Sequence, residues 1–168
     1  VYKLPETKFK DVGTFINSMV AIQPKEKFIS VYAISSFKEA QNVLLCTKTG
    51  TMKQTLLSEF EVTRYTKPVR AMKLADGDEL VATDIISDPL EIMLVTKNCE
   101  ALRFRATDIS LYGTTAGGVR SINLKSDDEV VSAFYANKGD EFLLAMWGVL
   151  PEYPQCTARN AVHNNIEY

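Results

Sequence analysis

Basic residues that could bind phosphate groups are gathered in two stretches of this sequence. Residues 43–74 carry a net charge of +4 and residues 97–125 carry +3, although the whole chain has a net charge of −2. Between and after them, residues 75–96 hold six acids and no base, and residues 126–168 have a net charge of −5. Lys and Arg at regular intervals neutralise the phosphates of a duplex without reading its bases. The pattern therefore indicates non-sequence-specific nucleic-acid binding, although charges also alternate on the wet face of any strand.

The segments that would carry these charges recur with a period of about 50 residues. VLLCTKTG (43–50) returns 49 residues later as IMLVTKNC (92–99), and VRAMKLADGDELV (69–81) returns 50 residues later as VRSINLKSDDEVV (119–131). Each copy contains short apolar or half-polar runs that end at glycine-containing or acidic turns. The acidic turn is expected to close a hairpin between the runs on either side of it. Four short strands per unit are typical of a propeller-like architecture, so we predict an all-β fold.

The repeat divides the chain into two nearly complete units flanked by partial ones. A third copy begins at Phe142, and residues 22–29 are similar to the second half of an earlier copy. If the units stack as blades, their basic strands recur at one height and their acidic turns at another. The predicted boundaries are a partial first blade at 1–42, a second blade at 43–91, a third blade at 92–141, and the start of a further blade with a non-repeat tail at 142–168.

Acidic clusters and cysteines give little support to metal or nucleophile chemistry. The clusters at 76–79 and 127–129 offer the carboxylates that Mg²⁺ prefers, but they recur at the same point of each repeat, which favours a role in turns. The three cysteines lie far apart and His163 is the only histidine, so no zinc-site spacing is present. No nucleophile elbow, P-loop lysine or Cys/His pair is found either. We expect no metal and no cofactor, and buried thiols at Cys46 and Cys99.

The sparse, odd-numbered cysteines also indicate a reducing cytosol and not a disulfide framework. No run is long and apolar enough to span a bilayer, and the first residues contain no secretory signal. We therefore expect a cytoplasmic protein that has no membrane partner. Because the chain begins at Val1, without Met and in a strand-like stretch, we expect it to be part of a larger protein.

Three segments of the sequence resemble a known family. TKTGTMKQTLLSEF (47–60), VRAMKLADGDELV (69–81) and YGTTAGGVRSINL (112–124) look like repeats of the C-terminal domain of the A subunits of bacterial DNA gyrase and topoisomerase IV. The resemblance covers about residues 1–145 and implies a partial β-pinwheel of four-stranded blades, a propeller-like disc with its own strand connectivity. It also implies an outer rim that binds and bends double-stranded DNA. That DNA would pass to the catalytic N-terminal region of the same subunit, in a nucleoid-associated holoenzyme with a separate ATPase subunit.

The basic residues of the two nearly complete units are the predicted DNA-binding residues. Thr115, Gly117 and Gly118 are expected to let the backbone turn closely at a blade edge, because glycine has no Cβ to clash there. In the second blade the DNA-binding candidates are Lys48, Lys53, Arg64, Lys67 and Arg70, and in the third blade they are Lys97, Arg103, Arg105 and Arg120.

Departures from the family pattern favour topoisomerase IV over gyrase. The basic, glycine-rich Q-R-R-G-G-K-G box that marks gyrase is absent, and Thr114 stands where gyrase-like repeats usually have Arg. A domain that lacks the box is expected to bend or clamp DNA and not to wrap it chirally. A gyrase domain whose box lies outside this chain is the alternative. The segment 146–168 also lacks the repeat motif, and we predict that it is not native blade sequence, as an out-of-frame reading would produce.

Enzymatic activity is not expected of this chain itself, although the parent protein would be part of an ATP-dependent isomerase. Tyr65 and Tyr112 are not expected to cleave DNA, because the strand-cleaving tyrosine belongs to a catalytic core that this chain does not resemble. Two other classes stay open. A protein-interaction propeller would use an apolar or mixed patch at the face of the disc and would show no salt-dependent DNA affinity. A carbohydrate-active propeller enzyme would need a carboxylate cluster at its central channel.

Overall fold

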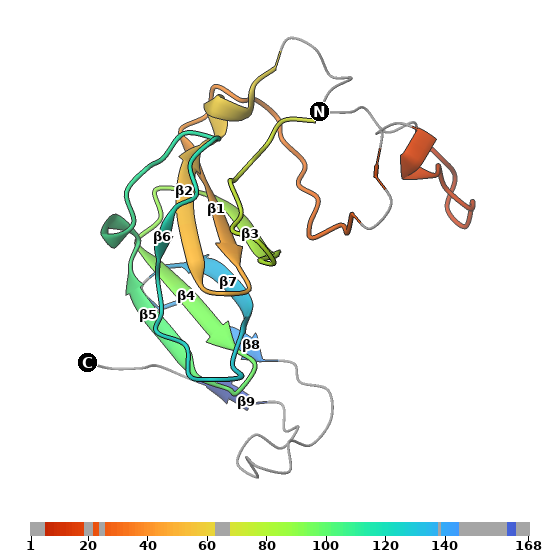
Figure 1. Cartoon of the computed structure of the whole chain (residues 1–168). Coiled ribbons are helices and arrows are strands. Elements are labelled where there is room, and N and C mark those ends of the chain that lie inside the picture. Colours follow the sequence, from red (N-terminus) through yellow and green to blue (C-terminus); the bar gives the residue numbers. More distant parts are fainter. Residues whose placement is uncertain are drawn as a thin grey trace.

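Each of the two nearly complete repeats forms an antiparallel sheet, and the two sheets pack against each other (Figure 1). The structure, a computed structural model, describes residues 6–18, 22–23, 26–62, 68–137, 139–144 and 161–163. Within these residues the regular structure consists of strands and short 3₁₀ turns, so the predicted all-β fold is confirmed. No helix in this part of the chain is long and apolar enough to cross a bilayer.

The first sheet has the strand order β3-β1-β2-β6. Its strands β1 and β2 form a hairpin, and β3 pairs with the other edge of β1. The fourth strand, β6, belongs to the next repeat and pairs with β2 at Thr51 and Met52. The bounds are β1 Gln41–Thr47, β2 Thr51–Leu56, β3 Leu80–Ser87 and β6 Val119–Arg120, and β2 continues into the 3₁₀ turn η2, Leu57–Phe60.

The second sheet repeats the first three strands in the order β5-β4-β7. In both sheets the register shifts at the end of the central strand, between Cys46 and Thr47 in β1 and between Val95 and Thr96 in β4. This shared bulge shows that the two repeats adopt the same local structure. In the described part of the chain, no strand lies beside β5 in the way that β6 lies beside β2. The bounds are β4 Glu91–Thr96, β5 Ala101–Arg105, η3 Ala106–Asp108 and β7 Val130–Ala136.

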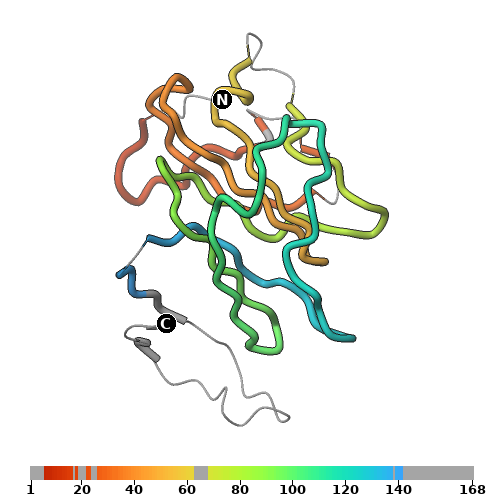
Figure 2. Tube along the Cα trace, turned by 90° about the vertical axis from the view of Figure 1, so that its left-hand side faces the viewer, coloured from red at the N-terminus to blue at the C-terminus, as the bar shows by residue number. Residues whose placement is uncertain are grey.

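The acidic turns do not close the hairpins that the sequence predicts. Residues 68–74 form no strand, and the turn after them packs on the β1–β2 turn, where the Lys48 amide donates to the Glu79 carbonyl at 2.8 Å. In the next repeat the corresponding segment becomes β6 and pairs with the preceding sheet (Figure 2). The prediction is wrong because the strand after the turn pairs with the free edge of β1 or β4. In the second of the two repeats, the segment before the turn, Val119–Arg120, pairs instead with the sheet of the preceding repeat.

Alternating side chains along β1 separate two apolar clusters. Leu44 and Cys46 pack between the sheets against Ile92 and Leu94, and all four are fully buried. Burial, with a smaller contribution from Asp78, raises the pKa of the Cys46 thiol to about 12, and the predicted buried thiol is confirmed there. The opposite face of the first sheet carries the second cluster, which consists of Val43, Leu45, Leu57 and Met72.

The second predicted buried thiol is wrong. Cys99 is partly exposed, and it follows β4 in a turn instead of continuing the strand. Its φ of 65° lies in the left-handed region, at the position where the first repeat has Gly50 with φ 81°. The apolar run ends at Val95–Thr96 because the bulge turns the chain out of the sheet there.

The flanking segments carry little regular structure in their described residues. Upstream of β1 the only such element is the 3₁₀ turn η1, Ile16–Ser18. Downstream of β7, the strand β8 (Phe142–Leu144) pairs antiparallel with β9 (Ala161–His163). Those three residues of the tail therefore pair with the start of the further copy. Residues 145–160 and 164–168 lie outside the described residues, so the origin proposed for the tail stays a prediction.

Candidate nucleic-acid interface

The edge strands β6 and β5 lie on the same side of the molecule, opposite β3 and β7 (Figure 1). We call these two strands the outer edge. Each of them ends in an exposed arginine, Arg120 in β6 and Arg105 in β5. Among the described residues, neither arginine forms an ion pair. The outer edge therefore presents two guanidinium groups to solvent, one from each sheet.

A third exposed arginine, Arg70, lies in the segment 68–74. This segment runs beside residues 106–118, which connect β5 to β6 and which we call the crossover segment. The Lys73 amide donates to the Ala116 carbonyl at 3.1 Å, and Lys73 itself is exposed. The structure thus brings Arg70, Arg105 and Arg120 to the outer edge or to the segment beside it. Their contact with DNA stays a prediction.

Three other predicted residues are paired with acids. Arg103 donates from Nε to Glu91 Oε2 at 2.7 Å and also from Nη2, and both side chains are mostly buried. Lys48 and Lys97 follow β1 and β4, and both reach Glu129, with Nζ–O distances of 2.8 and 3.8 Å. The hydrogen bond to Glu129 raises the pKa of Lys48. Because their charges are already paired with carboxylates, these three residues are less available to bind phosphates than the outer-edge arginines are.

The structure contradicts the predicted DNA-binding role of Lys53. Its side chain is fully buried, with 0% exposure, and Nζ donates to the carbonyls of Gly113 and Thr114 at 2.8 and 3.1 Å. Burial lowers the pKa of this lysine. The prediction is wrong because β2 is a central strand, covered by β1 on one side and by β6 on the other. Arg64 and Lys67 lie outside the described residues, as does Tyr65.

The acidic clusters are part of the turns. Asp78 Oδ1 accepts the amides of Thr49 and Glu79 at 3.1 and 2.9 Å, and its Oδ2 accepts the Thr49 hydroxyl at 2.6 Å. In the next repeat Asp128 Oδ1 accepts the amide of Asn98 at 3.0 Å. Burial acts to raise the pKa of Asp78, but these hydrogen bonds outweigh it and hold the pKa below its ordinary value. No group of three or more metal-ligating side chains occurs among the described residues.

Gly118 allows the crossover segment to approach β2 closely. Its φ is +88°, and a Cβ at this position would lie 2.4 Å from the Met52 carbonyl oxygen. Only glycine fits both the left-handed conformation and this contact. A Cβ at Gly117 would lie 3.2 Å from the Lys73 carbonyl oxygen, which is also tight, whereas Thr115 is exposed. The close turn predicted from these residues is thus present where the chain enters β6.

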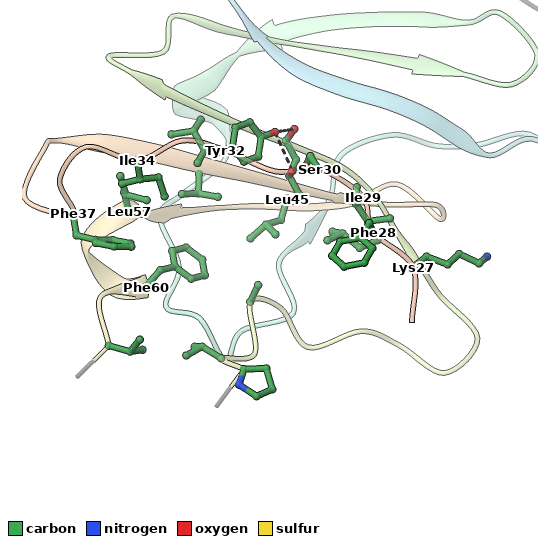
Figure 3. Close-up of a pocket in the computed structure, with 18 residues that line it drawn as sticks. Lys27, Phe28, Ile29, Ser30, Tyr32, Ile34, Phe37, Leu45, Leu57 and Phe60 are labelled. Carbon is green, nitrogen blue, oxygen red and sulfur yellow. Dashed lines mark hydrogen bonds between the residues drawn. The ribbon is translucent and has the colours of Figure 1, made fainter. Parts of the chain in front are cut away.

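An apolar groove of about 520 Å³ covers the second cluster, on the face of the first sheet that is turned away from the second sheet. Figure 3 shows Phe37, Leu57 and Phe60 at one end, Phe28 at the other, and Leu45 between them. The Tyr32 hydroxyl donates to the Thr83 carbonyl and so fastens the upstream segment along one wall. No carboxylate is among the described residues that line it, which does not fit a glycosidase channel.

The repeat explains what this groove is. Val43 and Leu45 in the groove correspond, at an offset of 49, to Ile92 and Leu94, which are buried between the sheets. The groove is therefore the same kind of surface that packs one repeat onto another. Four further residues of the groove correspond, at an offset of 49 or 50, to residues that are buried between the sheets. The pairs are Leu57 and Ala106, Phe60 and Ile109, Leu80 and Val130, and Ile85 and Tyr135.

Comparison with known proteins matches both repeats to one family. The family model described as DNA gyrase C-terminal domain, beta-propeller, matches residues 41–87 and 91–137, which is more than half of the chain. The chain belongs to this family. Its β1–β3 and β4–β7 units are thus two copies of the family's repeat, and the resemblance inferred from the sequence is confirmed.

The relatives include components of both enzymes that share this domain. The chain is 33% identical over 144 residues to the A subunit of DNA topoisomerase 4 from Staphylococcus epidermidis, and 34% identical over 144 residues to the A subunit of DNA gyrase from Escherichia coli. Each match covers 86% of this chain but only 18% and 16% of the relative. A crystal structure of the C-terminal domain of DNA topoisomerase IV superposes with a TM-score of 0.78 at 32% identity, over 84% of this chain and 44% of that one.

Proposed function

We propose that this domain binds duplex DNA along its outer edge without sequence specificity, bends it, and presents it to the catalytic core of a type II topoisomerase. The observation that carries the proposal is the pair of exposed, unpaired arginines on the edge strands of two consecutive sheets, Arg120 and Arg105. Family membership supports it, because the family is that of a DNA gyrase domain. Exposed guanidinium groups that repeat along an edge neutralise phosphates and read no bases.

Bending follows from the way that the edges are arranged. A duplex that contacts the edge strands of successive blades has to follow the curve on which those edges lie. Smooth bending of a site of about 20–30 base pairs by 40–90° costs about 1–6 kcal/mol, so flexible sequences should be preferred.

Within the family we assign the domain to the topoisomerase IV type. The absence of the Q-R-R-G-G-K-G box from this chain supports this choice, because the box marks the gyrase type. A gyrase-type domain is the second candidate, and the 34% identity to the E. coli gyrase protein favours it. In either case we infer a cytoplasmic, DNA-associated role. The ATPase subunit of the holoenzyme would be one partner, the catalytic region of the same polypeptide would be the other, and the domain itself would have no active site.

The linking number of a plasmid sealed in the presence of the domain separates the two candidates. A nicked plasmid is incubated with the chain, closed with ligase, deproteinised and resolved on a gel. Bending without chiral wrapping leaves the mean linking number unchanged while a mobility shift shows that DNA is bound. A linking-number change that grows with bound protein would favour the gyrase type. No mobility shift at low salt would contradict the proposed DNA binding itself.

A further inference from the structure

We propose that Lys53 and Gln54 are positioning residues that clamp the crossover segment onto β2 and thereby set where Arg120 lies on the outer edge. The two residues are consecutive on β2, so their side chains leave the strand on opposite faces. Each holds carbonyl groups of the crossover segment and neither is exposed to solvent. The inference rests on the proposed function insofar as the outer edge is where DNA binds.

Lys53 acts on the end of the crossover segment that is nearer to β6. Its ammonium group is fully buried and donates to two consecutive carbonyls, those of Gly113 and Thr114. No carboxylate of the described residues forms an ion pair with it. A buried ammonium group depends on such acceptors, because without them its desolvation is uncompensated. The charge of Lys53 is therefore directed at the backbone of this chain and not at an external phosphate.

Gln54 holds the other end of the crossover segment. Its side-chain amide donates to the carbonyls of Ala106 and Ile109 at 2.7 and 2.6 Å, and its Oε1 accepts the Tyr135 hydroxyl at 2.8 Å. Its backbone carbonyl accepts the amide of Tyr112 at 2.8 Å. Both amide hydrogens and the side-chain oxygen are thus used, as a buried amide requires. Through Tyr135 the same residue ties β7 of the second sheet to β2 of the first.

The clamp is specific to the junction that a crossover segment covers. At an offset of 49, Lys53 and Gln54 correspond to Leu102 and Arg103 on β5. Arg103 bonds to Glu91 of its own sheet, and no described strand or crossover segment lies on the edge of β5. The polar pair therefore occurs in the repeat whose edge is covered and not in the repeat whose edge is open.

The position of the outer edge follows from this clamp. The crossover segment starts directly after Arg105 and leads through Gly118 into β6, where Arg120 lies opposite Thr51. Beyond β6 the Ser121 amide and hydroxyl both donate to the Gly50 carbonyl, at 2.9 and 2.8 Å. Holding both ends of the segment on β2 fixes the separation between the two arginines. That separation determines which phosphates a bound duplex can offer to both.

Lys53→Met tests the clamp, because it removes the charge while it keeps a long apolar side chain, and Lys73→Met is its matched control on an exposed lysine. Amide exchange is measured by NMR at Tyr112 and Ser121, and at Met93 in β4 as a reference for the global fold. We expect exchange at Tyr112 and Ser121 to accelerate at least about tenfold in Lys53→Met, with Met93 unchanged and no change in Lys73→Met. Unchanged exchange at both Tyr112 and Ser121 in Lys53→Met would overturn the proposal.

A second variant covers the case in which Lys53→Met unfolds the whole domain. Tyr135→Phe removes only the hydroxyl that donates to Gln54 and leaves the buried ammonium group satisfied. Losing one neutral hydrogen bond should accelerate exchange at Tyr112 by about fivefold, with a smaller effect at Ser121. No acceleration at Tyr112 in this folded variant would contradict the role of Gln54.

DNA readouts separate positioning from direct contact. The slope of log affinity against log salt is measured for a duplex of about 40 base pairs, with donor and acceptor dyes on its ends to report the bend. Lys53→Met should keep the wild-type salt slope but lower the bend, whereas a phosphate contact would lose about one unit of slope. A lost unit of slope with unchanged amide exchange would make Lys53 a DNA contact. If the wild-type chain binds no DNA, the proposed function fails while the exchange data still decide whether the clamp exists.

Discussion

Replacement of Gly118 by alanine should destabilise the domain more than the same replacement at Gly77 or Gly113. Gly118 has φ +88°, and a left-handed conformation costs an L-residue about 1–2 kcal/mol. The new Cβ would lie 2.4 Å from the Met52 carbonyl oxygen and 3.0 Å from Lys53 Cβ, so β2 or the crossover segment has to move. Such overpacking costs about 1–3 kcal/mol, which gives a total loss of about 2–5 kcal/mol.

The two other glycines separate these contributions. Gly77 has φ +78°, but no atom lies within 4 Å of the place that a Cβ would take, so Gly77→Ala should lose only the conformational cost of about 1–2 kcal/mol. Gly113 has open space and no left-handed φ, so Gly113→Ala should change stability by less than about 0.5 kcal/mol. Urea unfolding followed by far-ultraviolet circular dichroism gives the free energies. Equal losses for Gly118→Ala and Gly77→Ala would refute the close contact between the crossover segment and β2.

Two further substitutions test the turns. Cys99→Gly should raise the free energy of unfolding by about 1 kcal/mol in urea, because Cys99 has φ 65° where the first repeat has a glycine; a loss of stability would contradict this. Asp78→Ala should lower stability by about 1–2 kcal/mol at pH 7, because two amides lose their acceptor, whereas exposed Asp76→Ala should have little effect. The pKa of Asp78 is lower in the folded state than the ordinary value of 3.8. Its contribution to the free energy of unfolding is therefore fully present above pH 3.8 and is lost as the pH falls through the folded-state pKa. Urea unfolding of wild type and Asp78→Ala is measured at pH 7 and at pH 3. We expect the difference in their free energies of unfolding to be smaller at pH 3, and an equal difference at both pH values would refute the role of the Asp78 carboxylate.

The repeat was sufficient to predict the all-β fold, since two copies with the same turns and apolar runs have to form the same units. It did not predict the pairing partner of the segment before each acidic turn. Periodicity describes one repeat at a time, whereas Val119–Arg120 pairs with Thr51 and Met52, which belong to the preceding repeat. Which sheet edge stays free for such a segment is a property of the packed molecule and leaves no mark on its own sequence.

The candidate site was predicted only in part, again because contacts between repeats cannot be predicted from the sequence of one repeat. Arg70, Arg105 and Arg120 are exposed as expected, but Lys53 is buried because β6 covers its strand. The sequence does contain one indication of this burial. A half-exposed strand alternates apolar and polar residues, so it would not have two consecutive polar residues such as Lys53 and Gln54. Two consecutive polar residues in a strand flanked on both edges require buried acceptors on both faces.

The central claim is that the outer edge neutralises DNA phosphates, and a salt titration of duplex binding tests it most directly. Fluorescence anisotropy with a duplex of about 40 base pairs is measured for wild type, for Arg105→Gln/Arg120→Gln, and for the control Lys48→Gln/Lys97→Gln, whose lysines are paired with Glu129. We predict that the first double variant loses about two units of the slope of log affinity against log salt, while the control loses much less. Equal losses in the two variants, or no salt-dependent binding by the folded wild type, would contradict the account.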